Sequence, residues 1–224
     1  MIGLSSGSWA QVIANCAGVE QLTIVEINPG YLRLIERYPA VAGILRNPKV
    51  QIEIDDGRRW LVRNPHKKFD LIVMNTTYHW RAHISNLLSM EFLALARRHL
   101  NGGGMLYYNT TSSGEALLTG ATVFPYSLRV WNFLAVSDSP IHVDKQRWEE
   151  QLSSYKVEGK VVFDLSDAEQ RRRLNEVLSL VDTLDGPGPA EDMSMELGDS
   201  LRQHWKGRRL ITDDNMGSEW SAIR

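Results

Sequence analysis

The sequence has a single cysteine, Cys16, which excludes an internal disulfide bond and any metal site built from cysteines. It has no apolar run long enough to cross a bilayer, and its formal net charge of -2 gives no bulk attraction to nucleic acid. We therefore expect a cytoplasmic protein, or the soluble part of a longer one. We expect no nucleic-acid partner and no membrane contact within this chain.

The 224 residues do contain enough apolar side chains for one sizeable core, since 43% of them are hydrophobic. We predict an α/β domain over residues 1–165. The composition then changes: residues 167–184 follow a helical pattern, and residues 185–200 hold acids and prolines but no basic residue. We therefore predict an appendage over residues 166–224, with a helix, a mobile acidic linker over 185–200, and a tail that packs back on the domain.

Strand-like and helix-like segments alternate in the first half of the chain. Apolar runs predict buried strands at residues 21–27 and 69–75, the alternating pattern at residues 50–55 predicts a strand, and residues 104–111 are predicted to form a further strand. Amphipathic stretches predict helices at residues 8–17, 28–38, 57–63 and 89–100. The predicted apolar face of the first helix consists of Trp9, Val12, Ile13 and Cys16. This repeated order predicts a doubly wound, mostly parallel α/β sheet.

Small or polar residues follow each predicted strand, at the edge of the sheet where ligands bind in such folds. A glycine turn over residues 3–7 lets a ligand approach the N-terminus of the next helix. Glu26 ends the next strand, where a carboxylate can accept hydrogen bonds from both ribose hydroxyls. Together these strand ends predict a nucleoside site. Its candidate residues are Gly3, Ser5, Gly7, Glu26, Asp56, Gly57 and Asn75.

The run "IGLSSGS…VEIN…DDGRRWL…FDLIVMN" resembles the nucleotide-binding half of the spermidine synthase family, aminopropyltransferases with the methyltransferase-type Rossmann fold. The resemblance covers roughly residues 1 to 135. It implies that Gly3 and Gly7 shape a pocket for S-adenosylmethionine or decarboxylated S-adenosylmethionine, bound as a substrate. It also implies that Glu26 holds the ribose and Asp56 meets the adenine amine. A small-molecule acceptor and a homodimer are further implications.

The chain departs from the family pattern after the strand at residues 69–75. Members carry D-x-x-D there, whereas this chain has Asn75-Thr76-Thr77-Tyr78, and no carboxylate lies between Asp70 and Glu91. The family's glycine-rich pattern I-G-G-G-D-G also corresponds in this chain to Ile2-Gly3-Leu4-Ser5-Ser6-Gly7. The loop after Tyr78 instead carries a fixed positive charge, so we expect a neutral or anionic acceptor rather than a common polyamine.

The candidate catalytic residues lie in this loop. We expect Asn75, Tyr78 and His79 to orient the acceptor, and His79 is also a candidate general base. His79 and His83 are four residues apart, but no third ligand is near them in the sequence, so we expect no metal site.

Only Met1 and Ile2 precede Gly3, although a glycine turn of this kind normally follows a complete strand. In the family's fold that strand is central, and without it the neighbouring strands would keep unpaired backbone groups. We therefore expect a truncated first strand and a natural chain that extends upstream of Met1.

These observations favour a spermidine synthase-like transferase that moves an aminopropyl or methyl group to a non-standard acceptor. Such catalysis depends mostly on alignment of the reacting atoms. The alternative is a catalytically inactive nucleoside- or partner-binding domain derived from the same family. An NAD-type oxidoreductase is disfavoured, because the glycine turn and Asp56-Gly57 fit the sulfonium family better.

Overall fold

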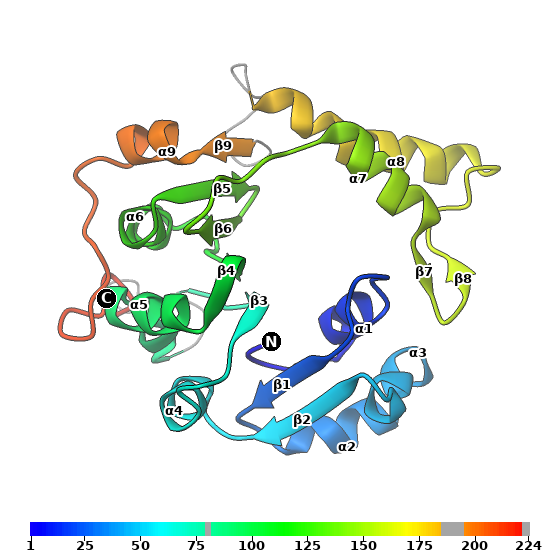
Figure 1. The fold of residues 1–224 in the computed structure, drawn as a ribbon, viewed down its shortest axis with the longest axis horizontal. Helices are drawn as coiled ribbons and strands as arrows, with labels where there is room; N and C mark the ends of the chain where they lie inside the picture. The colour runs from blue at the N-terminus through cyan, green and yellow to red at the C-terminus, as the bar shows by residue number, and fades with distance from the viewer. Residues whose placement is uncertain (79–81, 185–194, 221–224) are drawn as a thin grey trace. The chain divides into compact units, whose positions relative to one another are not determined.

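The structure, a computed structural model, describes residues 1–78, 82–184 and 195–220. The chain divides into two compact units (Figure 1). Unit 1 consists of Met1–Trp60 and Val143–Val181, and unit 2 of Leu61–His142 and Asp182–Arg224. This division follows packing rather than chain order, and the domain boundary at residue 165 stays a prediction.

Unit 1 is built on two parallel strands with helices packed against them. Its elements before residue 60 are α1 (Ser8–Ala14), β1 (Leu22–Glu26), α2 (Gly30–Glu36), α3 (Pro39–Ala42), η1 (Gly43–Arg46), β2 (Val50–Ile54) and the start of α4 (Gly57–Arg63). Its later elements are α7 (Lys145–Ser154), β7 (Lys156–Val157), β8 (Lys160–Val161) and α8 (Ala168–Ser179). β1 and β2 pair in parallel over their whole length, so the predicted strands are confirmed.

The start of the chain runs alongside β1. Ile2 forms a parallel bridge with Val25, and the N–H of Gly3 donates to the carbonyl oxygen of Val25 at 2.8 Å. This pairing brings the glycine turn to the carboxyl end of β1, where Glu26 lies. Two segments more than twenty residues apart in the sequence thus meet at one edge of unit 1.

The buried face of α1 differs from the predicted one. Ala10 and Ala14 are buried in the core of unit 1, whereas Val12 is 51% exposed. The helix ends at Ala14, and its small side chains permit close packing on β1 and η1, whereas Ile13 of the predicted face is only partly buried against this core. Cys16 follows the helix at intermediate exposure, and burial raises the pKa of its thiol.

Unit 2 contains a five-stranded sheet in the order β3-β4-β6-β5-β9. Its elements are β3 (Phe69–Met74), η2 (Ile84–Leu87), α5 (Met90–Arg98), β4 (Leu100–Asn109), α6 (Gly114–Val123), β5 (Tyr126–Val130), β6 (Phe133–Ser137), η3 (Val181–Thr183, which begins in unit 1), β9 (Met195–Leu197) and α9 (Gly198–His204). β3 and β4 are parallel, and β6 is antiparallel to both β4 and β5. β3, β4 and β5 therefore run in one direction, and the predicted mostly parallel α/β class is confirmed.

The predicted acidic linker is wrong over residues 195–200. Met195–Leu197 forms β9, which pairs antiparallel with β5, and α9 begins at Gly198. The Met195 side chain is only 3% exposed, so apolar burial fixes this short strand at the edge of the sheet. Residues 185–194 of the predicted linker lie outside the described residues.

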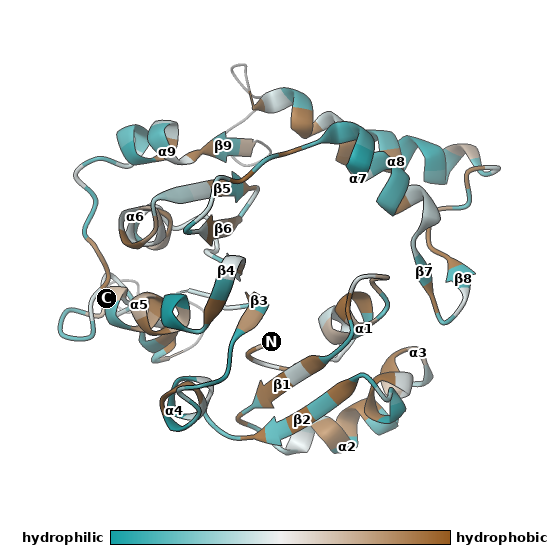
Figure 2. Cartoon of the chain, in the orientation of Figure 1, coloured by the Kyte–Doolittle hydropathy of each residue, from teal (hydrophilic) through white to brown (hydrophobic). Residues whose placement is uncertain are grey.

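The helices of the 145–179 region have mostly polar surfaces. Figure 2 shows hydrophilic residues over most of α7 and α8. α7 has no buried residue, and α8 buries only Leu174 and Leu178. Within the part of the chain that the structure describes, no helix combines the length and the apolar character needed to span a bilayer.

Candidate functional site

The glycine turn of unit 1 adopts a backbone that favours small residues. Gly3, Ser5 and Gly7 have φ angles of 86°, 49° and 81°, in the left-handed region. Gly7 is the N-cap of α1, and a Cβ at this position would lie 3.2 Å from Cδ1 of Ile35. A larger residue at position 7 would therefore meet both a strained backbone and a core side chain.

The Glu26 carboxylate closes this turn. Its Oε2 accepts hydrogen bonds from the N–H groups of Leu4 (2.6 Å) and Ser5 (3.2 Å), and its Oε1 accepts one from the N–H of Asn28 (2.8 Å). The residue is 3% exposed, so these are buried, charge-assisted bonds. Glu26 thus fixes the backbone on both sides of the strand end, which local sequence patterns do not reveal.

These bonds limit what Glu26 can offer to a ligand. A carboxylate provides about four acceptor positions. With three taken by backbone N–H groups, Glu26 can accept one more donor without rearrangement. Accepting bonds from both ribose hydroxyls would require it to release at least one backbone N–H group.

Asp56 and Gly57 lie after β2, at the start of α4. The Asp56 carboxylate caps the helix, since its Oδ1 accepts a hydrogen bond from the N–H of Arg59 at 2.8 Å. Asp55, its neighbour, pairs with the Arg59 side chain. A Cβ on Gly57 would lie 2.5 Å from Cγ2 of Ile2, so only glycine allows the first residues of the chain to approach this turn. The structure therefore gathers the predicted residues of unit 1 around one strand edge.

Asn75, the predicted site residue after β3 in unit 2, is oriented by a chain of amide side chains. The backbone N–H of Thr111 donates to Asn109 Oδ1 at 2.8 Å, and a backbone N–H can only donate, which identifies that oxygen. Asn132 Nδ2 also donates to it, at 2.9 Å. Asn109 Nδ2 in turn donates to Asn75 Oδ1 at 3.0 Å. One of the two acceptor positions of the Asn75 oxygen is thus taken, and the identity of that oxygen places the NH₂ group on the other branch of the exposed amide.

Tyr78 is 0% exposed and lies between protein groups. Its hydroxyl donates to Glu115 Oε2 at 3.1 Å and accepts a hydrogen bond from the N–H of Ser218 at 2.8 Å. Burial is the largest cause that raises the pKa of Tyr78 to about 12, so the hydroxyl is protonated at neutral pH. The Tyr78 hydroxyl is therefore bound by groups of the protein itself.

His79, the third predicted catalytic residue, lies outside the described residues. His83 is exposed, and its ring makes an edge contact with Trp220 at a centroid distance of 5.6 Å. Across residues 1–78, 82–184 and 195–220, no group of three or more His, Cys, Asp or Glu side chains is placed to hold a metal ion.

The sequence analysis missed three residues that shape unit 2. They are Glu115, Asn132 and Glu219. Glu115 carries the one local signal, an acid in the first turn of α6, which is a usual position for a carboxylate near a helix N-terminus. The partners of the other two are distant in sequence, so no local pattern could have indicated them.

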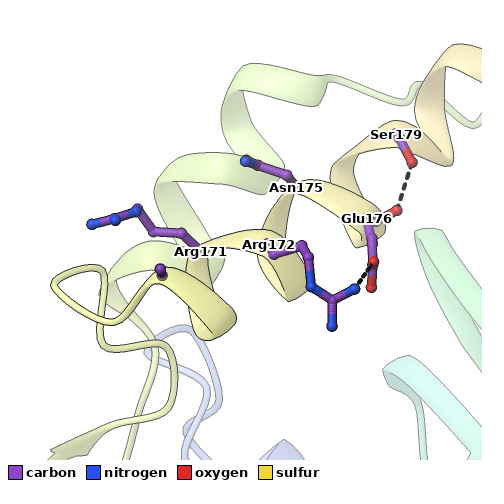
Figure 3. Close-up of a pocket in the computed structure, with 6 residues that line it drawn as sticks. Arg171, Arg172, Asn175, Glu176 and Ser179 are labelled. Atoms are coloured by element: carbon purple, nitrogen blue, oxygen red, sulfur yellow. Dashed lines mark hydrogen bonds and ion pairs between the residues drawn. The ribbon is translucent and has the colours of Figure 1, made fainter.

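An open depression lies on the surface of α8 (Figure 3). Its lining residues are Ala168, Arg171, Arg172, Asn175, Glu176 and Ser179, all from one helix. Arg172 pairs with Glu169 and Glu176, so its charge is already compensated. This surface therefore has the properties of a solvated helix face.

No family model matches the chain. Curated proteins named polyamine aminopropyltransferase are similar to it. The one from Mycobacterium tuberculosis (strain ATCC 25618 / H37Rv) is 29% identical over 148 residues, which cover 59% of this chain and 28% of that protein. The one from Pectobacterium atrosepticum is 33% identical over 107 residues, covering 47% of this chain and 37% of that protein. The chain thus spans about a third of the length of these relatives.

Solved structures share the fold. Spermidine synthase from Thermotoga maritima matches with a TM-score of 0.57 and 18% identity, over 70% of this chain and 59% of that one. Human methyltransferase-like protein 13, in complex with SAH, matches with a TM-score of 0.52 and 15% identity, over 85% and 83%. The chain therefore has the methyltransferase-type α/β fold.

Within the proteins of this fold, the sequence similarity is to the polyamine aminopropyltransferases. Together with the fold, the curated polyamine aminopropyltransferases confirm the predicted resemblance to the spermidine synthase family.

Proposed function

We propose that this protein is a transferase that binds S-adenosylmethionine or decarboxylated S-adenosylmethionine and alkylates a small-molecule acceptor other than a common polyamine. The observation that carries the proposal is the positive-φ glycine turn held at a strand end by the buried Glu26 carboxylate. Small residues and backbone N–H groups at a helix N-terminus suit a nucleoside ligand. The similarity to aminopropyltransferases supports transfer chemistry at such a site.

Two groups of residues receive roles in this proposal. The nucleoside-binding group consists of Gly3, Ser5, Gly7, Glu26, Asp56 and Gly57. Asn75 contacts a substrate directly, Tyr78 shapes its loop, and His79 remains the candidate base.

In the reaction, the acceptor's lone pair forms a bond to a carbon attached to the sulfonium sulfur. The C–S bond breaks with its electron pair passing to sulfur, and the acceptor's proton leaves to a base or to water.

The orientation of Asn75 favours a particular class of acceptor. An NH₂ group can donate to a carboxylate or to a neutral oxygen, but it cannot accept a hydrogen bond from an ammonium group. A polyamine is a multiple cation at neutral pH and gains nothing from this donor. The amide chain from Asn132 through Asn109 therefore supports a neutral or anionic acceptor.

The alternative, a nucleoside- or partner-binding domain without catalysis, is also supported by one observation. Glu26 already satisfies three backbone N–H groups, so its carboxylate has a structural role that does not need a ligand. Ligand binding without turnover would favour this alternative.

Calorimetric titration with the two sulfonium nucleosides tests the proposal. We expect at least one of them to bind with a Kd in the micromolar range or below, about -8 kcal/mol. Preference for the decarboxylated form would indicate aminopropyl transfer, and preference for the intact form methyl transfer. Failure of both to bind would contradict the proposed function.

Substitution Asn75→Asp tests the acceptor class. The change adds a negative charge and replaces the donor with an acceptor, so we expect kcat/KM for putrescine to rise about tenfold and that for glutamate to fall about tenfold. Steady-state release of the nucleoside product with each amine measures both values. Asn175→Asp, at an exposed position of α8, is the matched control for added charge. Equal changes in both variants would contradict a specific role for Asn75.

A further inference from the structure

The C-terminal segment Ile211–Glu219 packs within unit 2 against the loop that follows β3. This segment lies beside α5, near the C label in Figure 1. The N–H of Met90 donates to the carbonyl oxygen of Ile211 at 2.9 Å, and the N–H of Ile211 donates to Thr119 Oγ1 at 2.9 Å. Ile211 is fully buried, so the segment is anchored at its start.

Glu219 binds the loop at the entrance to η2. Its carboxylate accepts hydrogen bonds from the backbone N–H of His83 and, at 2.9 Å, from that of Ser85. Each oxygen takes one of these N–H groups, and Glu219 is only 3% exposed. His83 has a φ of 60°, a conformation that few non-glycine residues adopt without support. A buried carboxylate 136 residues away in the chain provides that support.

The other end of the loop is bound to the same segment. Tyr78 accepts a hydrogen bond from the N–H of Ser218, and both Tyr78 and Ser218 donate to the carboxylate of Glu115. The Ser218 hydroxyl lies 2.6 Å from Glu115 Oε2. These contacts fix Tyr78, three residues after Asn75.

A third contact fixes the helix that follows. Ser89 is the N-cap of α5, where its hydroxyl oxygen accepts a hydrogen bond from the N–H of Phe92. The same hydroxyl donates to Asp213 Oδ1 at 2.6 Å. The loop between β3 and α5 is therefore held at Tyr78, at residues 83–85 and at Ser89, each time by residues 211–219.

We propose that Glu219 is a positioning residue, through which the segment Ile211–Glu219 sets the conformation of residues 82–88 in the acceptor loop that follows β3. The inference rests on the proposed function, because it assumes that this loop meets the acceptor. It predicts that loss of the Glu219 carboxylate impairs acceptor use and leaves nucleoside binding in unit 1 unchanged. A residue that supported only the general stability of the fold would not separate these two properties.

The N–H groups of His83 and Ser85 point at two separate acceptor oxygens, which a carboxylate provides. Each Glu219 oxygen accepts from a different N–H group, whereas glutamine has one oxygen and one NH₂ group, so in Glu219→Gln the NH₂ group would face the N–H of His83 or of Ser85. An unsatisfied buried N–H group then favours an altered loop conformation. The substitution preserves side-chain size and so perturbs packing little.

The experiment compares Glu219→Gln with Asp214→Asn, an exposed acid in the same segment, in the full chain. We expect amides of residues 82–89 to exchange with solvent about tenfold faster in E219Q than in the wild type, and the KM for the accepted amine to rise about tenfold with a smaller change in kcat. The Kd for the sulfonium nucleoside should stay within about twofold, and D214N should match the wild type.

The outcomes separate this inference from the proposed function. Faster exchange with an unchanged acceptor KM, or equal losses of nucleoside and acceptor binding, would overturn the positioning role alone. A wild type that binds neither nucleoside, or that turns over neither putrescine nor glutamate, would overturn the proposed transferase and the positioning role with it. If E219Q does not fold, Ser218→Ala removes the hydroxyl bond to Glu115 and gives the same comparison with a smaller expected change.

Discussion

Replacement of Glu26 by alanine is expected to abolish binding of the sulfonium nucleoside, with a loss of affinity of about 100-fold or more. Two causes act in the same direction. The variant lacks the acceptor for a ribose hydroxyl, and it releases the N–H groups of Leu4 and Ser5 that hold the glycine turn in its positive-φ conformation. Isothermal titration calorimetry of the variant and the wild type measures the effect.

The same substitution should reduce the free energy of unfolding by about 2 kcal/mol, because the buried N–H of Leu4 loses its partner. Binding is therefore measured under conditions in which far-ultraviolet circular dichroism shows the variant to be folded. Glu36→Ala, which removes an exposed carboxylate from α2, is the matched control. A folded Glu26→Ala variant with the affinity of the control would disprove the nucleoside site.

The second large effect is expected at Gly120, in the middle of α6. A Cβ at this position would overlap the hydroxyl of Tyr108 and lie 2.6 Å from Cδ2 of Leu134. Both side chains are fully buried, and the Tyr108 hydroxyl donates to the carbonyl oxygen of Ala116 at 3.2 Å, so neither can move away easily. We expect Gly120→Ala to lower the free energy of unfolding by about 2 kcal/mol, even though alanine favours the helix by about 1 kcal/mol.

Urea denaturation followed by fluorescence measures this change. Gly102→Ala is the matched control, since Gly102 is exposed in β4 and a Cβ there would meet no atom within 4 Å. The control should change stability by less than about 0.5 kcal/mol. If Gly120→Ala were as stable as Gly102→Ala, the packing of α6 on β4 and β6 described above would be incorrect.

Helices and strands predicted from local patterns agree with the structure where the apolar residues follow a single clear pattern. The apolar runs at residues 21–27 and 69–75 form β1 and β3, because continuous β-branched and apolar residues suit the interior of a sheet; four of the five residues of β1 and the last three of β3 are buried. Predictions failed where tertiary contacts outweigh composition. Residues 195–197 form a strand in spite of their acidic surroundings, because the Met195 side chain is buried beside β5.

For the candidate site, the order of strands predicted that the glycine turn and Glu26 belong together. It did not predict that Glu26 binds the turn through its own carboxylate. That bond depends on the separation of two backbone segments in space, which sequence spacing does not specify. Tyr78 shows the same limit: its position after β3 suggested a contact with substrate, whereas the structure surrounds its hydroxyl with Glu115 and Ser218.

The sequence by itself determined the α/β class, the glycine turn, the strand-end carboxylate and the absence of an acid from the loop after Asn75, because these follow from residue type and local periodicity. Only the tertiary structure decided the orientation of the Asn75 amide and the attachment of Glu219 to His83 and Ser85. Both depend on hydrogen bonds between residues 34 to 136 positions apart. Such bonds form only after the chain has folded, and no local pattern encodes them.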